Sequence, residues 1–377
     1  MNLTLRPGTS ADTERCGTIC YEAFKAIADR HQFPPDFPSP QAAVASTERR
    51  FSHASYYAVV AELEGRIVGS VFLDERSPIA SVASITVDPA AQNRMIGRRL
   101  MEAVLQRVAE RRCPGVRLIQ AAYNTGSLSL YAKLGFEVRE PLVAMQGPPL
   151  ALAVPGYTVR GATKGDIDEC NALCVRVHGH DRRAELVEAI ERGRATVVEH
   201  ADRLTGYATG LGFAGHAVGE GNVDLRALIG GASEFSGPGF LLPTRNGAMF
   251  RWCLEHGLRI VQPMTLMSIG LYNEPQGGFF ALNRLLKGLK LPREAVDYPH
   301  RSSCPRLRRS HRVLLPQTPF HSDRRFLPTG TGQALGAGDS PWVDRGQPPA
   351  GSGLNTRAAI IHWQADRGPG IPVPGYG

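Results

Sequence analysis

Apolar residues in the first part of the chain follow two spacings, which predict a succession of strands and helices. Leu100, Val104, Leu105 and Val108 share one face of a helix whose other face carries mostly Arg and Glu. Two runs on either side of Glu64-Gly65 predict a β-hairpin. The predicted strands are residues 3–6, 56–63, 66–73, 79–87, 116–121 and 136–145, and the predicted helices are 11–28, 41–51, 97–110 and 127–134. This order predicts an α/β fold with a mixed, mostly antiparallel central sheet flanked by helices.

The same pattern occurs a second time along the chain. Arg6, Asp12, Cys16 and Cys20 recur 154 positions later as Arg160, Asp166, Cys170 and Cys174, YAVV…IVG recurs as ATVV…LTG, and GFEVREPLVAM recurs as GLRIVQPMTLM. Three matches in the same order indicate a tandem repeat. We predict a first unit at residues 1–146, a linker at 147–156 and a second unit at 157–280.

Charge separates these two units from the rest of the chain. Residues 281–377 hold 14 Lys and Arg against 6 Asp and Glu, which accounts for the whole net charge of +8 and leaves the first 280 residues neutral. The same segment contains 12 Pro and 12 Gly, a composition typical of disorder. Two alternatives stay open: a basic RNA-binding tail, and a reading-frame shift near codon 280 that has replaced the last strand of the second unit.

Composition excludes several other classes. Seven cysteines, an odd number in a long chain, argue against a disulfide framework, and we expect them to be buried. His178-Gly179-His180-Asp181 lacks further ligands at suitable spacing, so we interpret it as a polar turn and expect no metal. The absence of a long apolar run and of a signal peptide predicts a cytoplasmic protein without a membrane partner.

The junction between residues 79–87 and 97–110 has the features of an anion site. Val87-Asp88-Pro89 ends a predicted strand, Gly97 opens an Arg-rich helix, and Gln92 and Arg94 lie between them. Free backbone N–H groups, the positive end of the helix dipole and cationic side chains converge at such a place. A pyrophosphate is a natural occupant, although neither a Walker-type motif nor a strand-linked GxGxxG is present.

This junction resembles the acetyl-CoA signature of the GNAT superfamily of N-acetyltransferases, [Q/R]-x-x-G-x-[G/A], aligned on Gln92, Met95 and Gly97. The segment NTGSLSLYAKLGF, from Asn124 to Phe136, resembles the family's second signature. The resemblance implies acetyl-CoA as the acyl donor. The residues implied to bind it are Ile85, Thr86, Val87, Gln92, Asn93, Arg94, Met95, Ile96, Gly97, Arg98 and Asn124.

The resemblance also implies a mechanism in which a substrate amine attacks the thioester directly. Backbone N–H groups around Thr86 and Val87 are the implied oxyanion donors, and Tyr131 matches the family's general acid. The base is not identified, with Asp74 and Glu75 as options. The acceptor is a small-molecule or protein amine, and nothing in the sequence indicates the oligomeric state.

One departure motivates an alternative from another class. The family's first glycine is Met95 here, which costs about 1–3 kcal/mol if the position needs a positive φ. A non-catalytic acyl-CoA-binding or regulatory module is therefore the second hypothesis, and Tyr131 discriminates because a binder needs no proton donor.

The second unit departs further from the signatures. Asn246 matches Asn124, but Cys253 stands where Tyr131 stands, and GEGNVDL occupies the place of the anion loop. We predict a catalytically degenerate copy that walls the substrate cleft, with Tyr272 and Asn273 among its polar lining.

Overall fold

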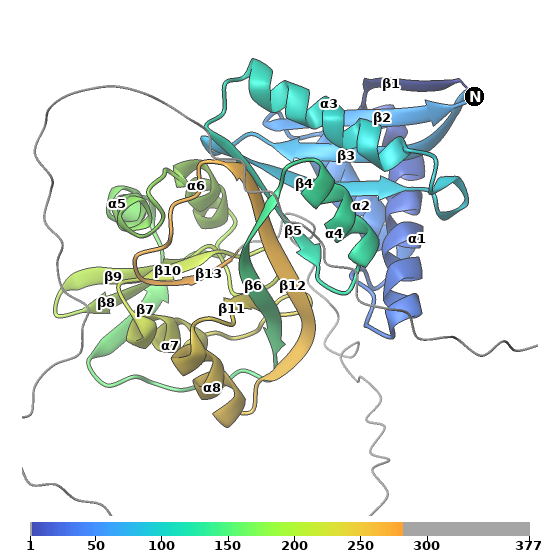
Figure 1. Cartoon of the computed structure of the whole chain (residues 1–377). Helices are drawn as coiled ribbons and strands as arrows, with labels where there is room; N and C mark the ends of the chain where they lie inside the picture. The colour runs from blue at the N-terminus through green and yellow to red at the C-terminus, as the bar shows by residue number, and fades with distance from the viewer. Residues whose placement is uncertain (1, 282–377) are drawn as a thin grey trace, which may run out of the picture. The chain divides into compact units, whose positions relative to one another are not determined.

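A computed structural model describes residues 2–281 of the chain (Figure 1). The predicted tail from 281 onward, with its two alternatives, therefore lies outside the described residues except for Ala281. Within the described range no helix is long and apolar enough to cross a membrane.

The first half of the described chain forms the predicted elements with shifts of only a few residues. Glu64 (φ 52°) and Gly65 (φ 77°) form the turn of the predicted hairpin, and Ser39 caps the second helix by accepting a hydrogen bond from the Ala42 N–H at 3.2 Å. The elements are β1 (Leu3–Pro7), α1 (Thr13–His31), α2 (Pro40–Phe51), β2 (Tyr56–Leu63), β3 (Arg66–Asp74), β4 (Ile79–Val87), α3 (Ile96–Glu110), β5 (Gly115–Ala121), α4 (Thr125–Lys133) and β6 (Glu137–Gln146).

The second half repeats this order, and the sequence repeat is visible as repeated contacts. Arg6 pairs with Asp12 at 2.8 Å, and Arg160 pairs with Asp166 at the same distance. The elements are β7 (Tyr157–Gly161), α5 (Ile167–His178), α6 (Arg183–Glu191), β8 (Thr196–His200), β9 (Arg203–Ala208), β10 (Ala217–Gly219), α7 (Asn222–Gly230), β11 (Phe240–Pro243), α8 (Gly247–Glu255), β12 (Arg259–Gly270) and β13 (Gly278–Phe280).

The strands form an eight-stranded sheet in the order β1-β2-β3-β4-β5-β12-β6-β11 and a five-stranded sheet in the order β13-β10-β9-β8-β7. The β4–β5 pair is parallel and the other pairs between the described strands are antiparallel. The predicted mixed α/β fold with mostly antiparallel sheets is confirmed.

The two units exchange their closing strands. β12 comes from the second unit but lies between β5 and β6 of the first. β6 comes from the first unit but lies between β12 and β11 of the second. Figure 1 shows β6 and β12 side by side in the middle of the molecule. The sequence boundary at residues 147–156 therefore divides the chain but not the sheets.

An apolar layer joins the two units around these strands. Phe37 after α1, Leu142 on β6, Phe213 of the second unit and Met264 on β12 belong to one buried cluster. Burial of such side chains is worth about 1.5–3 kcal/mol each. The expected burial is confirmed for Cys16, Cys20, Cys170, Cys174 and Cys253, whereas Cys113, in the loop after α3, is only half-buried. All six described cysteines are free thiols.

Candidate functional site

An opening between β4 and β5 is the first feature of the predicted site. The two strands pair only from Ile79 to Ser81 on β4 and from Gly115 to Arg117 on β5, so they part beyond these residues. The register between β3 and β4 also shifts between Val71 and Leu73, which marks a bulge. The rest of β4 therefore presents peptide groups to the opening rather than to β5. Ile85, Thr86 and Val87, implied to bind the acyl donor, lie on this stretch.

The anion loop lies at the wide end of this opening. It runs from Asp88 to Met95 and leads into α3, whose first N–H groups have no acceptor within the helix. Asn93 and Met95 both have φ 64°, in the left-handed region. Met95 thus has the positive φ on which the strain considered from the sequence depends, and the residue is 62% exposed to solvent.

The polar side chains of the loop are placed at its surface. Gln92 donates from Nε2 to the Val87 carbonyl at 3.3 Å, and Arg94 is exposed. Arg98 lies in the first turn of α3, where it pairs with Glu102 at 2.7 Å. Ile96 is buried in the core beneath the helix. The loop thus offers backbone N–H groups and cationic side chains to the same exposed region.

Tyr131 on α4 packs into the same apolar cluster as Ile85 and Val87, beside Phe136 in an edge-to-face contact at 6.0 Å. Its side chain makes no hydrogen bond within residues 2–281, and burial raises its pKa. The phenol therefore keeps its proton at ordinary pH. Asn124 caps α4 by accepting from the Ser127 N–H at 3.2 Å, and Asn246 caps α8 in the same way, which is a structural use of both side chains.

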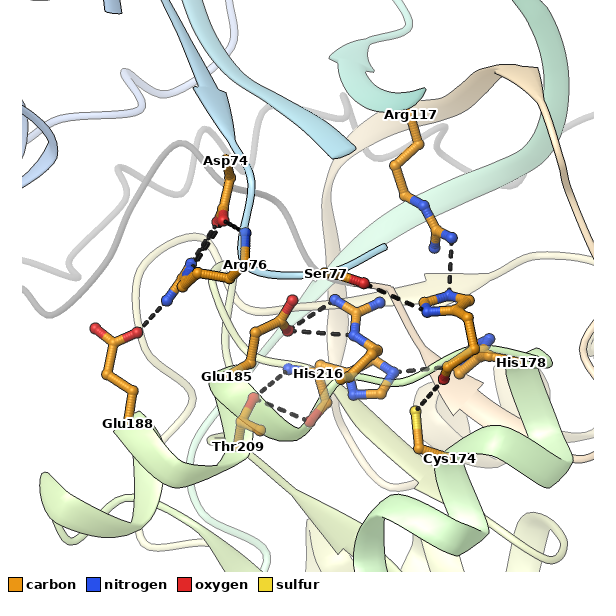
Figure 2. A network of polar contacts seen from close by, with 12 residues as sticks. Asp74, Arg76, Ser77, Arg117, Cys174, His178, Glu185, Glu188, Thr209 and His216 are labelled. Carbon is orange, nitrogen blue, oxygen red and sulfur yellow. Dashed lines mark hydrogen bonds and ion pairs between the residues drawn. The ribbon is translucent and has the colours of Figure 1, made fainter. Parts of the chain in front are cut away.

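The two carboxylates considered as bases are both ion-paired. Asp74 accepts hydrogen bonds from Arg76, which also bonds Glu188 of the second unit (Figure 2). Glu75 pairs with Arg107 at 2.9 Å. These contacts hold Asp74 and Glu75 in structural roles.

A buried histidine cluster lies next to this network. The ring Nε2 atoms of His178 and His216 are 3.0 Å apart, and Arg117 of β5 donates to His180 Nε2 at 2.8 Å (Figure 2). Burial lowers the pKa of His178 and His216 well below the usual value and lowers the pKa of His180 to about 3. The three rings are therefore neutral. Within the described range no group of three or more metal-ligating side chains is found.

Sequence reasoning did not find this cluster. The sequence predicts only a polar turn at His178-Gly179-His180-Asp181, and Arg117 and His216 are distant in sequence and follow no spacing that indicates contact. With Ser81 and Tyr272 these residues line a small cavity of about 30 Å³ between the units.

A second and much larger cavity, of about 880 Å³, opens elsewhere between the two units. Asp36 and Arg49 line it from the first unit, and Arg192 and Arg194 line it from the second. Its volume is in the range of small-molecule sites in proteins. No sequence motif indicates this cavity, because the loops that form it carry none.

The second unit is closed where the first is open. β13 pairs with β10 from Ala217–Phe280 to Gly219–Gly278, and Ala281 forms a bridge with Leu241 of β11. β13 thus fills the space between β10 and β11, the strands that correspond to β4 and β5. The N–H of Gly221 before α7 donates to the Asp224 carboxylate at 2.8 Å.

Comparison with known proteins agrees with this architecture. Residues 24–136 match the model of the Acetyltransferase (GNAT) family, so the chain contains a GNAT acetyltransferase domain. A mycothiol acetyltransferase of Nocardia farcinica is 34% identical over 116 residues, which are 29% of this chain but only 38% of that protein.

Two solved structures are similar over both units. One, from Pyrococcus horikoshii and described as an acetyltransferase, has a TM-score of 0.57 at 17% identity and covers 73% of this chain and 91% of its own. The other, a GCN5-related N-acetyltransferase from Sphaerobacter thermophilus, has a TM-score of 0.51 at 15% identity and covers 72% and 96%. These likenesses concern the fold of the whole described chain.

Proposed function

We propose that the chain is an N-acetyltransferase that moves an acetyl group from acetyl-CoA to a primary amine, and that the first unit carries the chemistry. The opening between β4 and β5, with the anion loop at its wide end, is the observation that carries this proposal. The matched GNAT domain and the acetyltransferase names of its relatives support it.

The residues present fit an acyl-CoA molecule. The N-terminus of α3 and the side chains of Arg94 and Arg98 suit a pyrophosphate, because unpaired N–H groups and the helix dipole favour anions. The unpaired stretch of β4 through Ile85, Thr86 and Val87 suits the amide-bearing arm of the molecule, which can pair with a strand. Acetyl-CoA supplies the activated thioester.

The proposed reaction is a direct transfer. The amine nitrogen bonds to the thioester carbon, the C–S bond breaks, and the leaving thiolate takes the phenolic proton of Tyr131. Backbone N–H groups around Thr86 and Val87 stabilise the oxyanion. Burial keeps Tyr131 protonated, which a general acid requires, but it also raises the phenol's pKa further above that of a thiol, which weakens the driving force for the transfer. The amine loses its proton to a base other than Asp74 and Glu75, whose carboxylates are engaged by arginines.

Met95 supports the second candidate, an acyl-CoA-binding module without catalysis. Met95 has a left-handed backbone conformation where the family has glycine, and this conformation is strained for a residue with a side chain. The affinity for acetyl-CoA is therefore the property that this substitution weakens first. The two candidates share the cofactor site and differ in their need for Tyr131.

Calorimetric titration with acetyl-CoA, followed by release of free thiol in the presence of a panel of amines, tests the proposal. We expect Tyr131→Phe to lower kcat by about 10²–10³-fold and to leave the acetyl-CoA Kd within about twofold. Cys253→Ala, at the matching position of α8, is the control and should change neither quantity. Thiol release that Tyr131→Phe leaves unchanged would remove Tyr131 as the acid, and binding without thiol release would favour the second candidate.

A further inference from the structure

The large cavity between the units holds an unusual excess of positive charge. Arg49 on α2 has its Nε and Nη2 atoms buried without a hydrogen-bond partner, and Arg194, before β8, has a buried and unpartnered Nε. Burial and the neighbouring Arg192 lower the pKa of both guanidinium groups, which nevertheless stay charged. A buried N–H of a charged group without an acceptor costs more than 1–3 kcal/mol.

The carboxylates of the described part do not neutralise this cluster. Glu188 pairs with Arg192 at 2.7 Å but is also bonded by Arg76, so its charge is shared. Glu234 lines the cavity and is exposed, and no ion pair within residues 2–281 joins it to Arg49 or Arg194. Arg49 and Arg194 therefore have no ion-pair partner within residues 2–281.

Asp36 lines the same cavity from the loop after α1, and no ion pair within residues 2–281 joins it to the arginines. It is buried, and its Oδ1 accepts a hydrogen bond from Gln262 Nε2 at 3.3 Å. Gln262 in turn accepts from the hydroxyl of Tyr123, which follows β5, at 3.4 Å. This chain of contacts connects the carboxylate with the end of the strand that borders the opening.

We propose that this cavity binds an acceptor molecule that carries an amine and an anionic group, with Asp36 receiving the amine end and Arg49, Arg192 and Arg194 receiving a carboxylate or phosphate. Guanidinium groups bind both anions through paired N–H donors. The volume of about 880 Å³ admits a small metabolite. The role of this molecule as the acetyl acceptor rests on the proposed function, whereas its binding in the cavity does not depend on acetyl transfer.

Direct binding tests the site without acetyl-CoA. In calorimetric titrations we expect phosphoethanolamine to bind more tightly than ethanolamine, and Arg49→Gln and Arg194→Gln each to weaken its binding by about 10-fold or more. Arg251→Gln, an exposed arginine on α8, removes the same charge elsewhere and should have no effect. Asp36→Asn should weaken phosphoethanolamine but leave inorganic phosphate unchanged, because phosphate lacks the amine.

Turnover then links the site to the proposed reaction and distinguishes the two anions. If the site takes a phosphate, we expect kcat/KM for phosphoethanolamine to exceed that for ethanolamine by about 10-fold or more. If it takes a carboxylate, we expect kcat/KM for 4-aminobutyrate to exceed that for 4-aminobutanamide by the same factor. Arg49→Gln should reduce the advantage through KM while the acetyl-CoA Kd stays constant.

Equal binding of charged and neutral amines, or variants without effect on either anion, would overturn the inference. Loss of acetyl transfer to every amine with arginine-dependent phosphoethanolamine binding intact would instead overturn the proposed function alone.

Discussion

The two units begin alike and diverge at the junction after their fourth strand. In the first unit, β4 and α3 are separated by the long loop from Asp88 to Met95, and the space beside β4 is open. In the second unit only Glu220 and Gly221 separate β10 from α7, and β13 lies beside β10. One scaffold thus has an open junction in one copy and a closed one in the other.

The N-termini of α3 and α7 also differ in charge, and the difference again leaves the first unit open to an anion and the second unit closed. α3 begins with arginines and unpaired N–H groups, whereas the N–H of Gly221 is already bonded by the buried Asp224 carboxylate. A helix N-terminus favours one negative charge, and in the second unit the chain supplies it. The comparison teaches that one internal carboxylate can take the place of a bound anion and that one short strand can fill the opening beside β10. We infer that the second unit binds no acyl-CoA.

The largest expected effect follows from this difference. We expect one acetyl-CoA to bind per chain, and Gly97→Glu to weaken binding by at least about 100-fold, because its carboxylate meets the phosphates. A Cβ at Gly97 has room, with Leu130 at 3.6 Å, and a melting temperature close to that of the parent chain checks that the variant is folded. Gly221→Glu is the matched control in the second unit. A stoichiometry of two, with half of it surviving in Gly97→Glu, would contradict the comparison.

The buried histidines should make the second unit the more acid-sensitive of the two. The folded pKa values of His178, His180 and His216 lie below 6.5, so their stabilisation is present above pH 6.5 and is lost as the pH falls. Below pH 6.5 each histidine that charges only on unfolding reduces the free energy of unfolding by at most about 1.4 kcal/mol per pH unit. Urea unfolding followed by tryptophan fluorescence, which includes Trp252, measures this loss.

His216→Gln should remove part of that pH dependence, since glutamine does not titrate. His31→Gln, at the exposed end of α1, is its control in the first unit. Equal pH dependence in both variants and the parent chain would show that the histidine cluster does not set acid stability.

A smaller effect is expected from relieving the anion loop. Met95→Gly removes a left-handed side chain, so we expect the acetyl-CoA Kd to fall by up to about 10-fold and the free energy of unfolding to rise by about 0.5–1 kcal/mol. Gln32→Gly, with φ 58° at the end of α1, should give the stability gain without the change in Kd. Weaker binding by Met95→Gly would indicate that the methionine contacts the ligand favourably.

The smallest expected difference between the two units concerns the Arg–Asp ion pair that both of them contain. Asp12→Asn and Asp166→Asn each break the repeated Arg–Asp pair, and we expect each to cost about 1 kcal/mol at pH 7. The arginine partner lowers the pKa of Asp12 to about 2, so its contribution is present above pH 4 and is lost as the pH falls toward 2. Thermal unfolding at pH 7 should give similar shifts for both variants, and a clear inequality would show that the repeat is not energetically symmetric.

The sequence predicts the positions of the helices and strands well, but it predicts poorly which strands pair with one another. Periodicity and turn residues are local, so β4 and the Glu64-Gly65 hairpin appear where they are predicted. β6 and β12 have similar sequences, and periodicity does not say which sheet either one joins.

The candidate site divides in the same way. The anion loop is contiguous, so its residues can be recognised from their spacing. The histidine cluster and the charged cavity assemble from segments such as those of Arg49 and Arg194, far apart in the chain. Their chemistry depends on burial, which no local pattern encodes.

The exchange of β6 and β12 also determines the order in which the strands of the first sheet can pair during synthesis. During synthesis β5 and β6 leave the ribosome with no strand between them, and β12 arrives only after β7 to α8 of the second unit have been made. The first sheet must therefore wait with an unpaired edge, and pairing over such long separations is slow. The opening between β4 and β5 lies one strand away from that edge, so its final shape is fixed only when β12 has left the ribosome.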